Sequence, residues 1–213
     1  GAFIGLLQDV NDEEVIHSFA FPDMTGAYAL ELPAVACDAP AIVFAKTADP
    51  YTSVSEYTEV NVPAGGMSGV NFYFESPDAN INVNIMDYVS ATSAGDDFDI
   101  FAETEDGHFV EGTAWGGSGY LNVLSGVEWM VEVELNDGSN YFSIVCDSSP
   151  NFDSDCTITP TVSGPNDLFY TAFPITATID VTVEDEYGQP AEGVLAAVNR
   201  MYDEYADPIL NTL

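Results

Sequence analysis

The sequence predicts an all-β protein built from β-sandwiches, and three observations lead to this fold class. Apolar and polar residues alternate with a period of two along much of the chain, which is typical of half-buried antiparallel strands. Clusters of Gly, Pro, Asn and Asp interrupt these runs at intervals of roughly 8 to 12 residues, the rhythm of sandwiches and barrels. Helical periodicity is nearly absent, and hydrophobic residues make up 46% of the 213 residues, which is ample for packed cores.

The strand-like runs follow one another from the N-terminus. In chain order they cover residues 1–10, 25–34, 41–46, 60–74, 80–85, 127–135 and 179–183. The clearest is VEWMVEVEL at 127–135, where five apolar residues fall on one face and three glutamates on the other. A last apolar run, at 194–205, fits either a helix or a strand over 194–198 with a loop, and the neighbouring β-structure favours the strand.

Turn residues divide the chain into three predicted units. Pro77, Asp78 and Asn80 break the run that ends the first unit, so we expect a first sandwich over residues 1–79. A second sandwich is predicted over 80–175. The third unit, 176–213, holds only opening strands.

The charge is strongly acidic, with 36 Asp and Glu against Lys46 and Arg200 and a net charge of -34. Such a surface repels phosphate backbones and anionic headgroups, so binding to nucleic acid or to a membrane surface is not expected. No apolar run reaches the length of a membrane span, so membrane insertion is not expected either. The charge fits three interpretations: binding of divalent cations, which we favour, a salt-rich habitat, or simple solubility.

Two of the three cysteines, Cys146 and Cys156, enclose a polar loop between strand-like runs. A disulfide there would suit an oxidising compartment, and two unpaired thiols are the alternative. Cys37 is then either a buried apolar thiol, the commoner case, or an intermolecular link.

The same loop is a candidate calcium site. Calcium takes several oxygen ligands from one or two loops. The loop offers four oxygen-bearing side chains: Asp147, Asn151, Asp153 and Asp155. A second acidic stretch offers Asp96, Asp97, Asp99, Glu105 and Asp106. Neither stretch has the EF-hand pattern, and carboxylates that only face water are the alternative for both.

No motif of a known catalytic site is present, and the two histidines are isolated, so no enzymatic activity is expected. Trp115, in TAWGGSG, could offer a stacking surface for a sugar, but packing in the core beside Trp129 is the favoured interpretation.

Two stretches carry a family resemblance: TGAYALELPA at 25–34 and VNVPAGGMSGVNFYF at 60–74. They resemble the middle and closing strands of carboxypeptidase regulatory-like domains. These are transthyretin-like Greek-key sandwiches that are also similar to the B-type repeats of surface adhesins. A looser copy lies at 116–134, and VTVEDEYGQPAEGV at 181–194 resembles the opening strand and turn. The resemblance implies tandem Greek-key transthyretin/Ig-like sandwiches with a C-terminal partial domain.

Some adhesin repeats of this kind are locked by an isopeptide bond from a lysine. Lys46 lies in the middle of its domain, which departs from that pattern, so an ordinary salt bridge is expected.

The resemblance also aligns Gly1 with Gly193, so the first domain is expected to lack its opening strand while residues 176–192 supply a surplus one. Either the chain is a slice of a longer tandem array, or Ile179, Val181 and Val183 fill the vacant position of the next molecule in a head-to-tail filament. A third possibility is that residues 1–10 are themselves the first strand.

These expectations describe an extracellular or cell-surface structural module that self-associates. The alternative is a carbohydrate- or partner-binding module of a secreted enzyme or adhesin.

Overall fold

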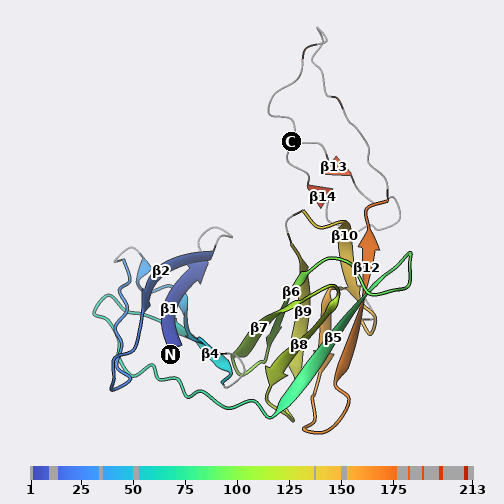
Figure 1. Ribbon diagram of the computed structural model, residues 1–213. Helices are drawn as coiled ribbons and strands as arrows, with labels where there is room; N and C mark the ends of the chain where they lie inside the picture. Colours follow the sequence, from blue (N-terminus) through green and yellow to red (C-terminus); the bar gives the residue numbers. More distant parts are fainter. Residues whose placement is uncertain are drawn as a thin grey trace. The chain divides into compact units, whose positions relative to one another are not determined.

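The computed structural model describes most of the chain up to residue 176 (Figure 1). The described residues are 2–9, 14–33, 36–49, 53–136, 138–149 and 153–176, with Thr182, Gln189, Ala197–Val198 and Ile209–Leu210. The chain divides into two compact units, Gly1–Pro174 and Ile175–Leu213.

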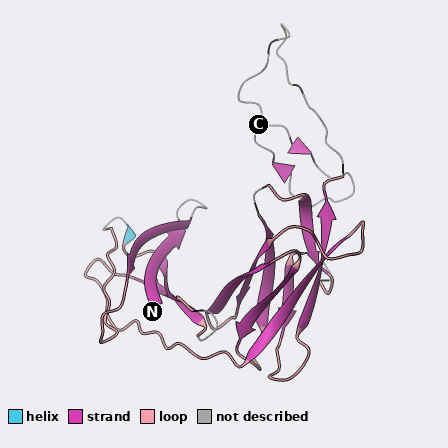
Figure 2. Ribbon diagram, in the orientation of Figure 1, coloured by secondary structure: helices cyan, strands magenta, loops and turns pink. Residues whose placement is uncertain are grey.

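The first unit is all-β, as predicted, and Figure 2 is coloured almost entirely as strand and loop. Its first six strands are β1 (Ala2–Asp9), β2 (Glu14–Ala20), β3 (Pro40–Thr47), β4 (Ser55–Asn61), β5 (Ala79–Asp87) and β6 (Phe98–Glu103). The next six are β7 (His108–Ala114), β8 (Ser118–Val123), β9 (Trp129–Leu135), β10 (Tyr141–Cys146), β11 (Asp155–Ile158) and β12 (Asp167–Pro174). In the described residues these strands form an eight-stranded sheet, in the order β11-β9-β6-β7-β4-β3-β1-β2, and a four-stranded sheet, in the order β10-β12-β5-β8.

Strands β5 to β12 form a two-layer sandwich with one continuous core. The fully buried side chains of Ile85 and Tyr170 from one sheet and Trp129 from the other meet in it. The Tyr170 hydroxyl donates to the carbonyl of Val131, 2.8 Å away in the opposite sheet. Burial of its ring raises the pKa of the Tyr170 phenol well above 10, so the hydroxyl stays protonated and keeps this link between the layers.

Strands β1 to β4 carry a second, smaller core. Ile4, Leu6, Val43 and Ala45 are buried there and form a cluster separate from the core of the sandwich. The eight-stranded sheet nevertheless continues from one group to the other, because β4 pairs with β7 through Ser55 and Phe109. Lys46 forms an ion pair with Glu111 of β7, the ordinary salt bridge that the sequence led us to expect. The division of residues 1–175 into two domains stays a prediction.

The second unit contributes a short two-stranded sheet, β13 (Ala197–Val198) and β14 (Ile209–Leu210). The predicted assembly residues Ile179, Val181 and Val183 lie outside the described residues.

Candidate functional site

Two extended segments lie against the small core of β1 to β4 without belonging to a sheet. In residues 27–33, the side chains of Tyr28, Leu30 and Leu32 pack on that core, while the residues between them are exposed. In residues 69–75, Val70 and Phe72 do the same. Both segments therefore have the period-two burial of strands, yet neither is paired as a strand anywhere in the described part of the chain.

A groove with an apolar floor lies beside these two segments. One part has a volume of about 490 Å³, and Leu6 of β1 and Val43 of β3 line it together with residues of both segments. The other part, of about 580 Å³, is lined by Ala2 and Ile4 of β1 and by aromatic residues of both segments. Gly26, Tyr28 and Asn71 line both parts, so the groove follows the sheet surface beyond a single pocket.

Tyr28 crosses between the two segments. Its hydroxyl donates to the carbonyl of Val70 at 2.7 Å, and its ring centroid lies 6.5 Å from that of Phe72. Burial of the ring raises the pKa of the Tyr28 phenol. A contact that needs the full length of a tyrosine side chain places the two backbones farther apart than the roughly 4.8 Å between paired strands.

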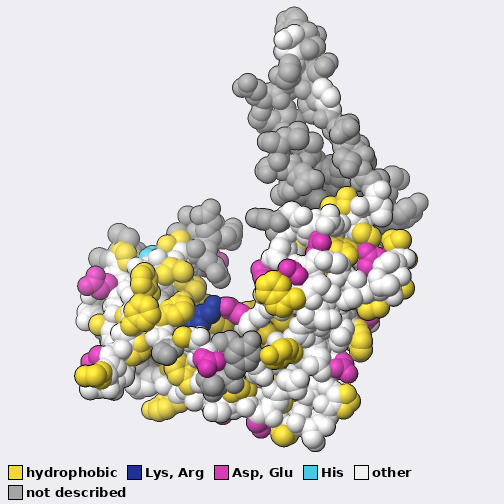
Figure 3. Space-filling model, viewed as in Figure 1, with side chains coloured by type: hydrophobic (Ala, Val, Ile, Leu, Met, Phe, Trp, Pro, Cys, Tyr) yellow, Lys and Arg dark blue, Asp and Glu magenta, His cyan; other side chains and the backbone are white. Residues whose placement is uncertain are grey.

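Large apolar side chains remain exposed beside the groove. Phe21, Tyr73 and Phe74 line its second part and are 73%, 78% and 38% exposed. Viewed as in Figure 1, hydrophobic side chains gather over β1 to β4 (Figure 3). Contiguous exposed apolar surface marks an interaction site more often than scattered residues do.

A fixed turn leads into the segment at 27–33. The Asp23 carboxylate accepts hydrogen bonds from the hydroxyl of Thr25 at 2.6 Å and from the backbone N–H groups of Thr25 and Ala27. These bonds, first the one from the Thr25 hydroxyl, lower the pKa of Asp23. Gly26 adopts a φ of 82°, which favours glycine.

Cys37 lines the groove, where it is partly buried. It forms no disulfide. Its loop is held by the buried side chain of Gln8, which donates to the carbonyls of Ala36 and Pro40 at 3.1 and 3.0 Å. His17 Nε2 donates in turn to Gln8 Oε1 at 2.9 Å. Sequence reasoning did not place Cys37 in this groove, since only the fold brings the loop beside residues 62–71.

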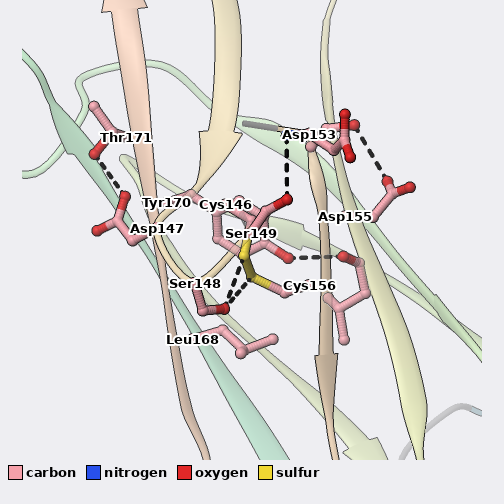
Figure 4. Close-up of a disulfide and its surroundings, with 12 residues drawn as sticks. Cys146, Asp147, Ser148, Ser149, Asp153, Asp155, Cys156, Leu168, Tyr170 and Thr171 are labelled. Carbon is pink, nitrogen blue, oxygen red and sulfur yellow. Dashed lines mark hydrogen bonds between the residues drawn. A yellow bond between two sulfur atoms is a disulfide. The ribbon is translucent and has the colours of Figure 1, made fainter. Parts of the chain in front are cut away.

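The predicted cysteine pair is joined in the structure. Cys146 and Cys156 form a disulfide, with Cα atoms 5.6 Å apart, and both are almost fully buried (Figure 4). Cys146 ends β10 and Cys156 lies in β11, the edge strands of the two sheets. The disulfide therefore links the two layers of the sandwich.

In the predicted calcium loop, Asp147 lies on the opposite side of the disulfide from Asp153 and Asp155 (Figure 4). Asp147 accepts a hydrogen bond from the hydroxyl of Thr171 at 2.7 Å, whereas Asp155 accepts one from Ser154 at 3.2 Å. Asp153 bonds through its backbone, where its carbonyl accepts from the N–H of Cys146. Asn151 is not among the described residues.

In the second acidic stretch, Asp96 and Asp97 stabilise loops through hydrogen bonds. Asp96 accepts hydrogen bonds from Ser139 and Asn140, and Asp97 accepts one from the N–H of Gly116 at 2.9 Å. Among the residues that the structure describes, no three acidic, histidine or cysteine side chains converge as metal ligands. Calcium binding stays a prediction.

The two outer faces of the sandwich differ in charge. The face of β11, β9, β6 and β7 carries a group of carboxylates: Asp99, Glu103, Glu111, Glu132, Glu134 and Asp155. Partial burial, with the charges of Asp155, Glu134 and Glu103, raises the pKa of Glu132. The face of β5, β8 and β12 instead presents Tyr120 and Phe169, 52% and 51% exposed, with asparagines between them.

The core placement expected for Trp115 is wrong. Trp129 is fully buried, whereas Trp115 is 70% exposed, because it lies in the tight connection between β7 and β8. The adjacent Gly116 and Gly117, both at positive φ, turn the chain there, which leaves the tryptophan outside the layers.

No family model, no curated protein and no solved structure matches this chain. Nor does any helix in the described residues have the length and apolar character needed to cross a bilayer.

Proposed function

We propose that this protein is a non-catalytic structural module of a cell surface or extracellular filament, and that copies join through a shared β-strand. The proposal treats the chain as tandem Greek-key, transthyretin-like sandwiches. The single observation that carries it is the apolar groove between residues 27–33 and 69–75, two strand-like segments that have no strand partner in the described part of the chain.

Elementary physics explains why such a groove points to assembly. A strand edge with unpaired N–H and C=O groups beside exposed apolar surface is a template for an incoming strand. Strand addition gives affinity through backbone hydrogen bonds and specificity through side-chain pockets. The disulfide between Cys146 and Cys156 supports a location in an oxidising compartment.

The experiment compares the size distribution of the 213-residue chain with that of residues 1–175, by sedimentation and electron microscopy. We expect the full chain to polymerise and the shorter one to remain a monomer. The shorter chain retains the whole first unit, so a cooperative thermal unfolding transition will confirm that it is folded. Polymers of equal length from both chains would contradict strand sharing through the tail.

A second candidate function is binding of a neutral polysaccharide on the face of β5, β8 and β12. Aromatic rings stack on sugar rings, and amides exchange hydrogen bonds with hydroxyls. Here Tyr120 lies beside Asn82, and Phe169 lies beside Asn84. Asn82 donates to Asp167 at 2.8 Å, which fixes the amide on the face.

Electrophoresis through gels containing a soluble neutral β-glucan tests this candidate. Retardation that is lost on Tyr120→Ala and kept on Trp115→Ala would support it. Equal mobility with and without the polysaccharide would reject it.

A further inference from the structure

We infer that the groove between residues 27–33 and 69–75 is the acceptor site, and that its occupant is the segment Ile179 to Val183 of a second copy of this chain. The inference rests on the proposed function and specifies the site and the strand that it uses. Four observations carry it.

The first observation is the fit between strand length and groove. The segments that border the groove are each seven residues long, or about 23 Å when extended. Residues 179–183 extend over about 17 Å, so this segment fits between them with room for a turn at either end.

The second observation is the alternation in the sequence. Ile179, Val181 and Val183 fall on one face, and Asp180 and Thr182 on the other. A strand in the groove must have one apolar and one polar face, because the floor of the groove is apolar and its opening faces solvent. A shift of one residue would place charged side chains on the floor, so the alternation also fixes the register.

The third observation is the apolar surface at the floor of the groove. Ala2, Ile4 and Leu6 of β1 line this floor, so a strand with three apolar side chains on one face can cover that surface.

The fourth observation is reach, which favours another copy over the chain's own tail. β12 packs on β9, and five strand steps separate β9 from β1 in the sheet, or about 24 Å. Ile179 follows Pro174 by five residues, which span at most about 18 Å. The five connecting residues are thus shorter than the path along the sheet from β9 to β1, which favours a second copy as the donor of the strand.

The test uses the full chain and two matched variants, Val181→Asp and Thr182→Asp. Both add the same charge at adjacent positions, but only Val181 faces the groove floor in the inferred register. Cys37 lines the groove and is the one cysteine outside the disulfide, so its alkylation rate under non-reducing conditions reports on occupancy. Assembly is measured by sedimentation on the same samples.

We expect the parent and Thr182→Asp to polymerise and to show slow alkylation of Cys37. Val181→Asp should be monomeric, with Cys37 reacting at least about tenfold faster, since a charge replaces a buried apolar side chain.

Other outcomes separate this inference from the proposed function. Polymers of Val181→Asp equal to those of the parent would overturn the assigned strand and leave strand sharing in place. Polymers with an unprotected Cys37 would overturn the assigned groove. A monomeric parent whose Cys37 is protected, relative to Val181→Asp, would show that the chain fills its own groove and overturn the second copy. A monomeric parent with a reactive Cys37 would overturn both proposals.

Discussion

Reduction of the disulfide between Cys146 and Cys156 should destabilise the sandwich by an amount set by the loop it closes. The bond joins the edge strands β10 and β11, so it adds a covalent link between two layers that are otherwise held by core packing and by the hydrogen bond from Tyr170 to Val131. Its main effect is to limit the conformations of the unfolded chain.

The sequence separation of 10 residues gives the magnitude. The loop-closure entropy for that length corresponds to about 2.7 kcal/mol at 25 °C. For a unit of this size, about 1 kcal/mol shifts the Tm by roughly 2–4 °C, so we expect a loss of about 5–10 °C.

Differential scanning calorimetry with and without dithiothreitol provides the measurement, and intact mass verifies that the bond is reduced. The Cys37→Ala variant is the control, because its response to reductant comes from the disulfide alone. The double variant Cys146→Ala, Cys156→Ala should melt near the reduced protein, slightly lower for the lost apolar contacts. An unchanged Tm in fully reduced protein would refute the loop-closure argument.

Four shorter predictions follow from the charges and buried polar groups. The pKa of Glu132 is raised above its usual 4.5, so the folded state favours the protonated carboxyl, and the stability that this carboxyl contributes is lost as the pH rises through the raised pKa. Glu132→Gln should therefore raise the Tm at pH 7 but not at pH 4. In the control, Glu128→Gln at an exposed position, the change in Tm should be the same at both pH values. Asn166 is buried, donates to the carbonyls of Asn80 and Thr161 and accepts a hydrogen bond from the Thr161 N–H. Asn166→Ala should therefore lower the free energy of unfolding, measured in urea, by about 2–4 kcal/mol. A loss below about 0.5 kcal/mol would show that these hydrogen bonds do not stabilise the fold. Because the net charge is -34, raising the salt from 0.01 to 1 M, which shortens the Debye length from about 30 to 3 Å, should raise the Tm, and a constant Tm would show that repulsion does not limit stability. Calcium at 1 mM should raise the Tm further at constant ionic strength, and an identical melt with chelator would reject the calcium loop.

Local alternation identified which side chains face inward, but it could not identify strand partners. The run at 127–135 became β9 from Trp129 onward, with Trp129, Val131 and Val133 buried and the glutamates on the outer face. The run at 25–34 alternates equally well, and Tyr28 and Leu30 do face the core, yet no ladder forms there in the described residues. Within a strand-like run, the alternation of residues indicates which face is buried, whereas pairing depends on a second backbone that the local sequence does not contain.

Contacts between segments far apart in the sequence could not be predicted from local patterns either. The pairing of β4 with β7 joins residues 55 and 109, and nothing in either run specifies the other. The disulfide was predictable because two cysteines at the ends of a short loop have few alternatives. The groove was not, because Cys37, Tyr28 and Val70 come together only through the fold.

The position of Lys46 has a consequence for proteolysis. Trypsin cuts after lysine and arginine, and the whole chain contains one of each. The bond after Lys46 lies inside β3, where Lys46 pairs with Phe3 and Thr47 pairs with Ala2. A protease needs an extended segment that is free of its neighbours, so cleavage there requires β3 to leave the sheet. The rate of cleavage after Lys46 therefore measures how often β3 leaves the eight-stranded sheet. A strand bound over β1 would slow this cleavage.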